Sequence, residues 1–144
     1  MITAGGISNL RLVLIDRLPT AARQEKEMQG QGLAVGEAVE GHLESESVRS
    51  FQLDAEKGTA VTLDVWARRL GSRLDPLLEV FDAGGREIAV SDDEPGLDGD
   101  CRVAFEMPAG GPCEVRLRDA TFSGGSQSFF RLRAGSFSAR GILY

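Results

Sequence analysis

Strict alternation of apolar and polar residues is the feature that most constrains how this chain folds. Apolar side chains occupy every second position in four segments, and mostly polar side chains lie between them: Val61, Leu63, Val65 and Ala67; Val103 and Phe105; Val115 and Leu117; Phe130 and Leu132. Successive side chains of a β-strand point to opposite faces of a sheet, so each segment reads as a strand with one buried and one wet face. The pattern predicts an all-β protein.

Turn-forming residues separate these segments from further candidate strands. The candidates are less regular apolar runs at residues 10–16, 39–43, 48–54, 77–82 and 87–91. Clusters of glycine with charged or small residues lie between strands, at residues 56–58, 70–72, 82–85, 91–100, 109–111 and 123–125. Many short strands joined by regular turns are typical of a β-sandwich.

A chain of 144 residues is long enough for one domain with a single core. The only helix-like stretch, residues 20–28, is short and polar, and residues 30–36 have the glycine content of a flexible hinge. We therefore expect an N-terminal strand with an acidic, glycine-rich linker over residues 1–36, a β-sandwich over residues 37–136 and a tail over residues 137–144.

Charge and hydropathy exclude two classes of partner. The net charge of −6 repels phosphate backbones, which argues against nucleic acid. No apolar run approaches the roughly eighteen residues that cross a bilayer, so we expect no membrane insertion. No basic segment followed by an apolar stretch and a small-residue cleavage site is present at the start of this sequence, so it carries no recognisable secretion signal.

The two cysteines, Cys101 and Cys113, are predicted to be buried free thiols. Residues 107–112 between them have the composition of a hairpin loop, which would place Cys113 opposite residues near Phe105. In that register Cys101 lies several rungs away, farther than the short Cα separation that a disulfide requires.

The sequence lacks the residues that common hydrolytic mechanisms need. A catalytic triad requires a base, and the one histidine, His42, lies on a short predicted strand. Two cysteines and one histidine at this spacing match no structural zinc site. Paired carboxylates can cleave glycosides, but acidic residues at strand ends are too common to indicate this chemistry. We predict that the chain is not an enzyme, with a small hydrolase using the acidic cluster as the alternative.

The loop at residues 91–100 contains four aspartates, Asp92, Asp93, Asp98 and Asp100. Carboxylates are hard oxygen donors of the kind that calcium takes in groups of about six to eight, together with carbonyls and water. The loop does not match the ligand spacing of an EF-hand, and like charges are tolerated in a solvated surface turn. A turn between two strands is the leading interpretation, and calcium binding is the alternative.

Four arginines and one tryptophan are the candidate binding residues. Arg116 and Arg118 lie on one polar strand face and Arg131 and Arg133 on another, so the four would form one basic stripe if the two strands pair. A salt-bridged solvent face beside glutamates is the leading interpretation of these arginines, and contact with an anion or an acidic polysaccharide is the alternative. Trp66 falls among polar positions, where its ring could stack on a ligand or be shielded by a loop.

Eight blocks of the sequence follow one another in an order that is characteristic of a known family. The blocks are 51–58, 72–76, 80–86, 91–93, 100–105, 108–111, 115–119 and 130–132. Together they resemble the bacterial pre-peptidase C-terminal domain, over a match that covers roughly residues 37–135. The versions that it resembles most occur in large multidomain proteins of planctomycete-type bacteria. The resemblance implies a jelly-roll-like antiparallel β-sandwich of about eight strands, usually a non-catalytic appendage of secreted or cell-surface proteins.

The same resemblance implies calcium ligands in the linker that precedes the sandwich. Related collagen-binding modules of clostridial collagenases bind calcium through an acidic linker of the pattern E-x-E-x-N-D. Glu25 and Glu27 match the two glutamates, whereas Gln29 and Gly30 replace the amide and the aspartate. The departure removes one charged donor from that set.

These observations lead to one functional hypothesis and its rivals. We expect a non-catalytic accessory module, extracellular or at the cell surface, that binds an extracellular polymer, protein or polysaccharide, or an adjacent domain of the parent chain. The alternatives are a structural spacer or folding assistant without a ligand, and the small hydrolase.

Overall fold

The alternating segments form strands of two sheets in the computed structural model, which describes residues 2–3, 6–7, 14–21 and 30–137. One sheet has five strands in the order β3 (Gln31–Ala34), β5 (Val48–Asp54), β10 (Cys113–Asp119), β7 (Pro76–Phe81) and β8 (Glu87–Ser91). The other has four strands in the order β4 (Glu37–His42), β11 (Phe129–Gly135), β6 (Ala60–Trp66) and β9 (Arg102–Glu106). Two short strands near the start pair with each other, β1 (Ile2–Thr3) and β2 (Gly6–Ile7).

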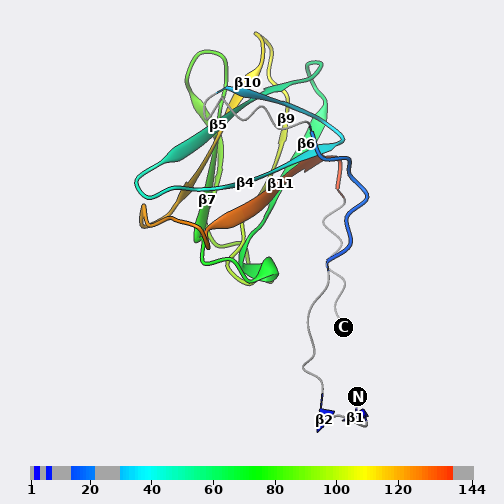
Figure 1. Cartoon of the computed structure of the whole chain (residues 1–144). Coiled ribbons are helices and arrows are strands. Elements are labelled where there is room, and N and C mark those ends of the chain that lie inside the picture. The colour runs from blue at the N-terminus through cyan, green and yellow to red at the C-terminus, as the bar shows by residue number, and fades with distance from the viewer. Residues whose placement is uncertain (1, 4–5, 8–13, 22–29, 138–144) are drawn as a thin grey trace.

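The two sheets pack face to face as a jelly-roll-like β-sandwich, which confirms the predicted fold class (Figure 1). Neighbouring strands are antiparallel, apart from β3, which runs parallel to β5. The one helical turn of the described residues is the 3-10 turn η1 (Arg68–Leu70). Across the described ranges, no helix has the length and apolar character needed to cross a membrane.

The core lies between the sheets and is made by the apolar positions of the alternating pattern. Phe51 of β5 meets Phe130 of β11 edge to face across the sandwich, with the ring centroids 6.4 Å apart. Leucine and valine side chains from both sheets fill the rest of the interior and are at most 2% exposed, among them Val39, Leu53, Leu63, Val65, Leu78, Leu117 and Leu132. Each such side chain contributes about 1.5–3 kcal/mol through burial.

Residues 31–34 form strand β3, so the prediction of a flexible hinge over residues 30–36 is wrong. Leu33 points into the core and is 3% exposed, and the strand pairs with β5 from Gln31 to Ala34. The five-stranded sheet therefore includes residues before position 37. Of the predicted strand at residues 10–16, the first four residues lie outside the described part, and residues 14–16 are not in a strand.

Both cysteines are buried and free, as predicted, but the predicted hairpin between β9 and β10 is wrong. Strand β9 pairs with β6 in the four-stranded sheet, whereas β10 lies between β5 and β7 in the other sheet. Cys113 is opposite Leu53 of β5, and Cys101 immediately precedes β9. The connection over residues 107–112 thus crosses from one sheet to the other.

Residues 14–21, here called the N-terminal strap, lie along the edge of the four-stranded sheet. Ala21 donates a backbone hydrogen bond to the carbonyl of Ala38 at 2.8 Å, and the amide of Ala38 donates to the carbonyl of Pro19 at 3.0 Å. Thr20 forms a parallel bridge with Ala38. The strap thereby covers part of the edge strand β4, whose backbone groups a sheet edge otherwise exposes.

We predict that β3 stabilises the sandwich. Replacing Leu33 by alanine should lower the free energy of unfolding by about 2–4 kcal/mol, because it leaves a cavity at a buried position. Gly32→Ala is the matched control: a Cβ at Gly32 meets nothing within 4 Å, so its unfolding curve should be nearly unchanged. Equal midpoints in urea for Leu33→Ala and wild type would contradict the role of β3.

Candidate functional site

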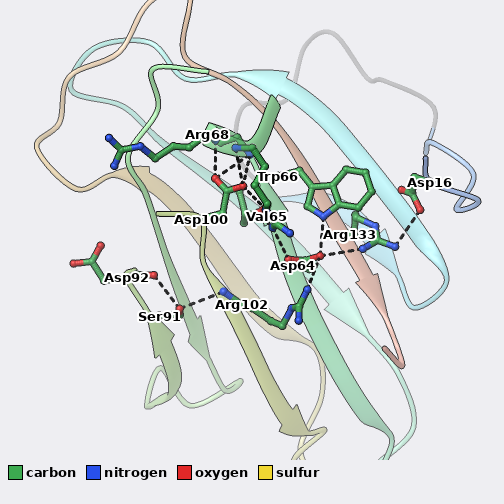
Figure 2. A network of polar contacts seen from close by, with 12 residues as sticks. Asp16, Asp64, Val65, Trp66, Arg68, Ser91, Asp92, Asp100, Arg102 and Arg133 are labelled. Atoms are coloured by element: carbon green, nitrogen blue, oxygen red, sulfur yellow. Dashed lines mark hydrogen bonds and ion pairs between the residues drawn. The ribbon is translucent and has the colours of Figure 1, made fainter. Parts of the chain in front are cut away.

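Asp64 is the centre of a polar network on the outer side of the four-stranded sheet (Figure 2). It occupies a polar position of the alternating pattern of β6, yet it is fully buried. Its cross-strand neighbours are Arg133 of β11 and Arg102 of β9. One carboxylate oxygen accepts from Arg133 at 2.9 Å and from the indole Nε1 of Trp66 at 2.8 Å, and lies 3.2 Å from Arg102. The other oxygen accepts from Arg69 at 2.9 Å.

Asp100, also fully buried, holds the chain that follows β6. Its carboxylate accepts from the backbone amides of Ala67 at 3.1 Å, Arg68 at 2.6 Å and Arg69 at 3.3 Å, and from Nε of Arg69 at 2.7 Å. The carboxylate thereby satisfies amides at the start of the turn η1. Because Arg69 bonds both Asp64 and Asp100, the two buried aspartates belong to one network.

Asp16 of the N-terminal strap extends this network to the sheet edge. Its carboxylate accepts from Arg131 at 2.8 Å and from Arg133 at 3.1 Å, and its side chain is 7% exposed. Arg131 also donates to the carbonyl of Leu18 at 2.9 Å and to the hydroxyl of Thr20 at 2.9 Å. Side-chain and backbone groups of the strap are therefore both bound by one arginine.

Burial and charge compete in setting the pKa of these carboxylates. Burial raises the pKa of Asp64, but the charges and hydrogen bonds of Arg69 and Arg102 outweigh it and hold the pKa below its usual value. Burial likewise raises the pKa of Asp16, and hydrogen bonds from Arg131 and Arg133 lower it by more. The network therefore requires ionised carboxylates.

The structure corrects the predicted arginine stripe. Arg116 and Arg118 lie on β10 in the five-stranded sheet, whereas Arg131 and Arg133 lie on β11 in the four-stranded sheet, so their strands do not pair. Arg131 and Arg133 are only 11% and 14% exposed and belong to the network around Asp64. The four guanidiniums therefore form two separate pairs, on the outer sides of opposite sheets.

Trp66 is 8% exposed, so its ring does not lie open among polar side chains. The guanidinium of Arg133 covers the ring, with its carbon 4.3 Å from the ring centroid, and Arg69 lies 5.9 Å from it. Of the two alternatives for Trp66, the structure supports the shielded ring. Arginine side chains, rather than a loop, cover it.

Arg116 and Arg118 lie on the outer face of the five-stranded sheet beside aromatic rings, with side chains 43% and 21% exposed. The guanidinium of Arg116 stacks 4.4 Å from the ring centroid of Phe81, and that of Arg118 stacks 4.7 Å from Phe122. Val90 of the edge strand β8, which pairs with the strand of Phe81, is 53% exposed. We call these five residues, on the outer side of the five-stranded sheet, the arginine–aromatic face.

Charge on this face is balanced. Arg116 forms an ion pair with Glu114 at 2.8 Å, and Nε of Arg118 lies 3.6 Å from Glu79. Hydrogen bonding to Glu114 raises the pKa of Arg116. The face therefore presents paired charges and flat aromatic rings rather than an excess of positive charge.

The loop at residues 91–100 is a hydrogen-bonded turn, as the leading interpretation held. The amide of Glu94 donates to the carbonyl of Asp100 at 3.1 Å, and that of Leu97 donates to Glu94 at 3.1 Å. Asp98 adopts a positive φ of 56°, a conformation that aspartate tolerates better than most residues. Asp92, Asp93 and Asp98 are exposed.

Asp100 is not available as a calcium ligand in this arrangement. The carboxylate of Asp100 faces N–H donors and a guanidinium, which occupy the oxygens that a cation would need. Within the described part of the chain, no three carboxylate, histidine or cysteine side chains gather closely enough to hold a metal ion. Glu25 and Glu27 lie outside the described residues.

Across the described residues, the histidine and the two cysteines do not converge on a catalytic arrangement. His42 is exposed on the edge strand β4, with its ring 6.2 Å from that of Phe129. Cys101 and Cys113 are buried, and burial raises the pKa of both thiols, which makes them poor nucleophiles. The arginines and aspartates of the network bond one another.

Comparison with known proteins gives a fold rather than a family. No protein-family model matches this chain, and no curated protein matches it. The chain is similar to the solved pre-peptidase C-terminal domain of a collagenase from Bacillus anthracis, with a TM-score of 0.59 and 7% identity over 76% of this chain and 97% of that one. It is also similar to Aeromonas hydrophila PliG, a periplasmic inhibitor of g-type lysozyme, with a TM-score of 0.53 and 18% identity over 74% of this chain and 96% of that one.

These likenesses define the class of protein as a β-sandwich domain with the fold of pre-peptidase C-terminal and PliG domains. The resemblance noted in the sequence is thereby supported at the level of fold. A closer relation to the planctomycete-type versions or to collagen-binding modules stays a prediction.

Acid should unfold the protein through the network. A group whose folded-state pKa is lowered stabilises the fold above its unfolded pKa, about 3.9 for aspartate, and this stabilisation is lost as pH falls through the folded pKa. Because Asp16 and Asp64 both have lowered pKa values, we expect the thermal midpoint to fall steeply below about pH 4. A midpoint that stays constant from neutral pH to about pH 2 would contradict this.

Asp64→Ala should cost about 3–5 kcal/mol at neutral pH, because it leaves buried guanidiniums without their partner. Asp92→Ala, which removes an exposed carboxylate, is the control and should change stability by less than about 0.5 kcal/mol. Urea unfolding measures both variants. Equal losses in the two would show that burial of Asp64 is not what makes it important.

Calcium tests the loop geometry directly. If the turn persists in solution, calcium at about 1 mM should leave the thermal midpoint of wild type equal to that in chelator, since a bound ion would stabilise by about 2.7 kcal/mol at a hundredfold excess over Kd. A rise of several degrees that disappears in Asp93→Ala would instead place an ion at this loop.

Proposed function

We propose that this chain is a non-catalytic accessory β-sandwich module that binds an extracellular polymer, or an adjacent domain of its parent protein, through the arginine–aromatic face. The observation that carries the proposal is the stacking of two guanidiniums on aromatic rings at an open sheet surface. Arginine and aromatic residues are enriched among the side chains that dominate binding energy at protein interfaces.

The opposite sheet is less suited to this role. The N-terminal strap and the network around Asp64 cover its outer side, and Arg131 and Arg133 are committed to Asp16 there. By contrast, the side chain of Arg116 is 43% exposed, so a partner can reach it without displacing part of the chain. Accessibility therefore selects the five-stranded sheet.

The chemistry of the face indicates the kind of partner. Its guanidiniums are already paired with Glu79 and Glu114, so a strongly acidic polymer gains little from them. Flat rings and guanidinium planes instead suit a surface that offers apolar side chains and a few carbonyl or carboxylate acceptors. A protein partner fits this description better than a charged polysaccharide.

The comparisons are compatible with such a role. One similar structure is named for its inhibition of a lysozyme, and another is a domain attached to a collagenase. The former is described as periplasmic. An extracellular or cell-surface location is part of our proposal for this chain, as is the absence of catalysis.

Arrays of extracellular proteins and polysaccharides test the proposal, followed by affinity measurement on any hit. Arg116→Ala combined with Phe122→Ala should weaken binding by at least about tenfold, since interface residues of these types each contribute about 1–2 kcal/mol. Arg86→Ala, which removes a 78% exposed arginine from the turn between β7 and β8, is the matched control and should bind as wild type does.

Two results would contradict the proposal. A wild-type protein that binds nothing on either array would favour the structural spacer. A ligand bound equally well by the double variant and by wild type would place the binding surface elsewhere on the molecule.

A further inference from the structure

Arg133 contacts two segments that lie next to the four-stranded sheet, the N-terminal strap and the residues that follow β11. Nη2 of Arg133 donates to Asp16 of the N-terminal strap at 3.1 Å. The ring centroid of Phe137, two residues beyond the end of β11, lies 4.2 Å from the guanidinium carbon of the same arginine. A single guanidinium thus holds segments that are far apart in the sequence.

The position of the Phe137 ring is determined by residues of the four-stranded sheet that lie beneath it. A Cβ built on Gly135 would lie 2.5 Å from Cζ of the Phe137 ring, so the ring occupies the space that a side chain at Gly135 would need. The hydroxyl of Thr62 on the neighbouring strand donates to the carbonyl of Phe137 at 3.4 Å. Phe137 therefore packs over the outer side of the four-stranded sheet.

The partners of Arg133 depend on one another because they share one cation. Trp66 lies 4.3 Å from the guanidinium carbon and Phe137 lies 4.2 Å from it, while Asp64 and Asp16 accept hydrogen bonds from its nitrogens. Ion pairs and cation–π contacts strengthen as water is excluded. A ring that shields the guanidinium from water consequently strengthens its bond to Asp16.

We propose that Arg133 acts as a clasp, which couples the packing of the N-terminal strap against the four-stranded sheet to the packing of Phe137 against the same sheet. If either the strap or Phe137 leaves the sheet, water reaches the guanidinium of Arg133 and weakens its interaction with the other segment. A partner or neighbouring domain that pulls one segment from the sheet would thereby loosen both and uncover Arg131 and Arg133. The clasp is independent of binding at the arginine–aromatic face, which lies on the other sheet.

Amide hydrogen exchange measured by NMR tests this coupling. The amide of Ala21, which bonds to Ala38, reports on the strap, and the amide of Leu132 reports on the body of the sheet. In Phe137→Ala, we expect exchange at Ala21 to accelerate about threefold or more, because the guanidinium of Arg133 loses one cation–π contact. Exchange at Leu132 should be unchanged.

Two further variants isolate the cause. Gly135→Ala keeps the aromatic residue but displaces its ring, and should accelerate exchange at Ala21 in the same way. Phe122→Ala removes the comparable ring from Arg118 on the other sheet and should leave Ala21 unchanged. In an Arg133→Gln background, Phe137→Ala should have no further effect on Ala21.

The outcomes are distinct. Unchanged exchange at Ala21 in both Phe137→Ala and Gly135→Ala would overturn the clasp. So would an equal acceleration at Ala21 in Phe122→Ala, or an equal acceleration at Ala21 and Leu132, since each would trace the change to general loss of stability. Persistence of the full effect in the Arg133→Gln background would remove the arginine from the mechanism.

Discussion

The carboxylate of Asp64, buried among guanidiniums, is the interaction on which one whole side of the sandwich depends. A buried charge is tolerated only when partners replace the water it has lost, and Asp64 receives bonds from Trp66 and Arg133 as well as from the turn after β6. Through these partners the sheet is linked to Asp100 and, by way of Arg133, to the strap at Asp16. Without the carboxylate of Asp64, the guanidiniums that surround it would repel one another.

This arrangement divides the surface into two kinds of sheet face. The outer side of the four-stranded sheet is closed by its own ion pairs and by segments that flank the sandwich. The outer side of the five-stranded sheet carries arginines stacked on rings, with Arg116 open to solvent. A division of this kind allows one face to maintain the fold while the other is available to a partner.

Period-two alternation was sufficient to predict the sandwich and most of its strands, because burial of one strand face is a local property of the sequence. Strand β3 was missed since its glycine-rich sequence contains a single large apolar residue, Leu33, within four positions. The arginine stripe failed for a different reason: β10 and β11 are consecutive in sequence but belong to different sheets, and strand pairing is not local. The network was missed because polar positions were equated with exposed ones, although Asp64 is covered by the side chains of Arg69 and Arg133.

Arg116 differs in accessibility from Arg131 and Arg133 because the network around Asp64 closes the outer side of the four-stranded sheet and no such network covers Arg116. Modification of arginine side chains by phenylglyoxal, followed residue by residue with peptide mass spectrometry, measures this difference in the native protein. Rapid modification is expected at Arg116, whose side chain is 43% exposed, and slow modification at Arg131 and Arg133, whose side chains are 11% and 14% exposed. Equal rates at all three positions would contradict this expectation.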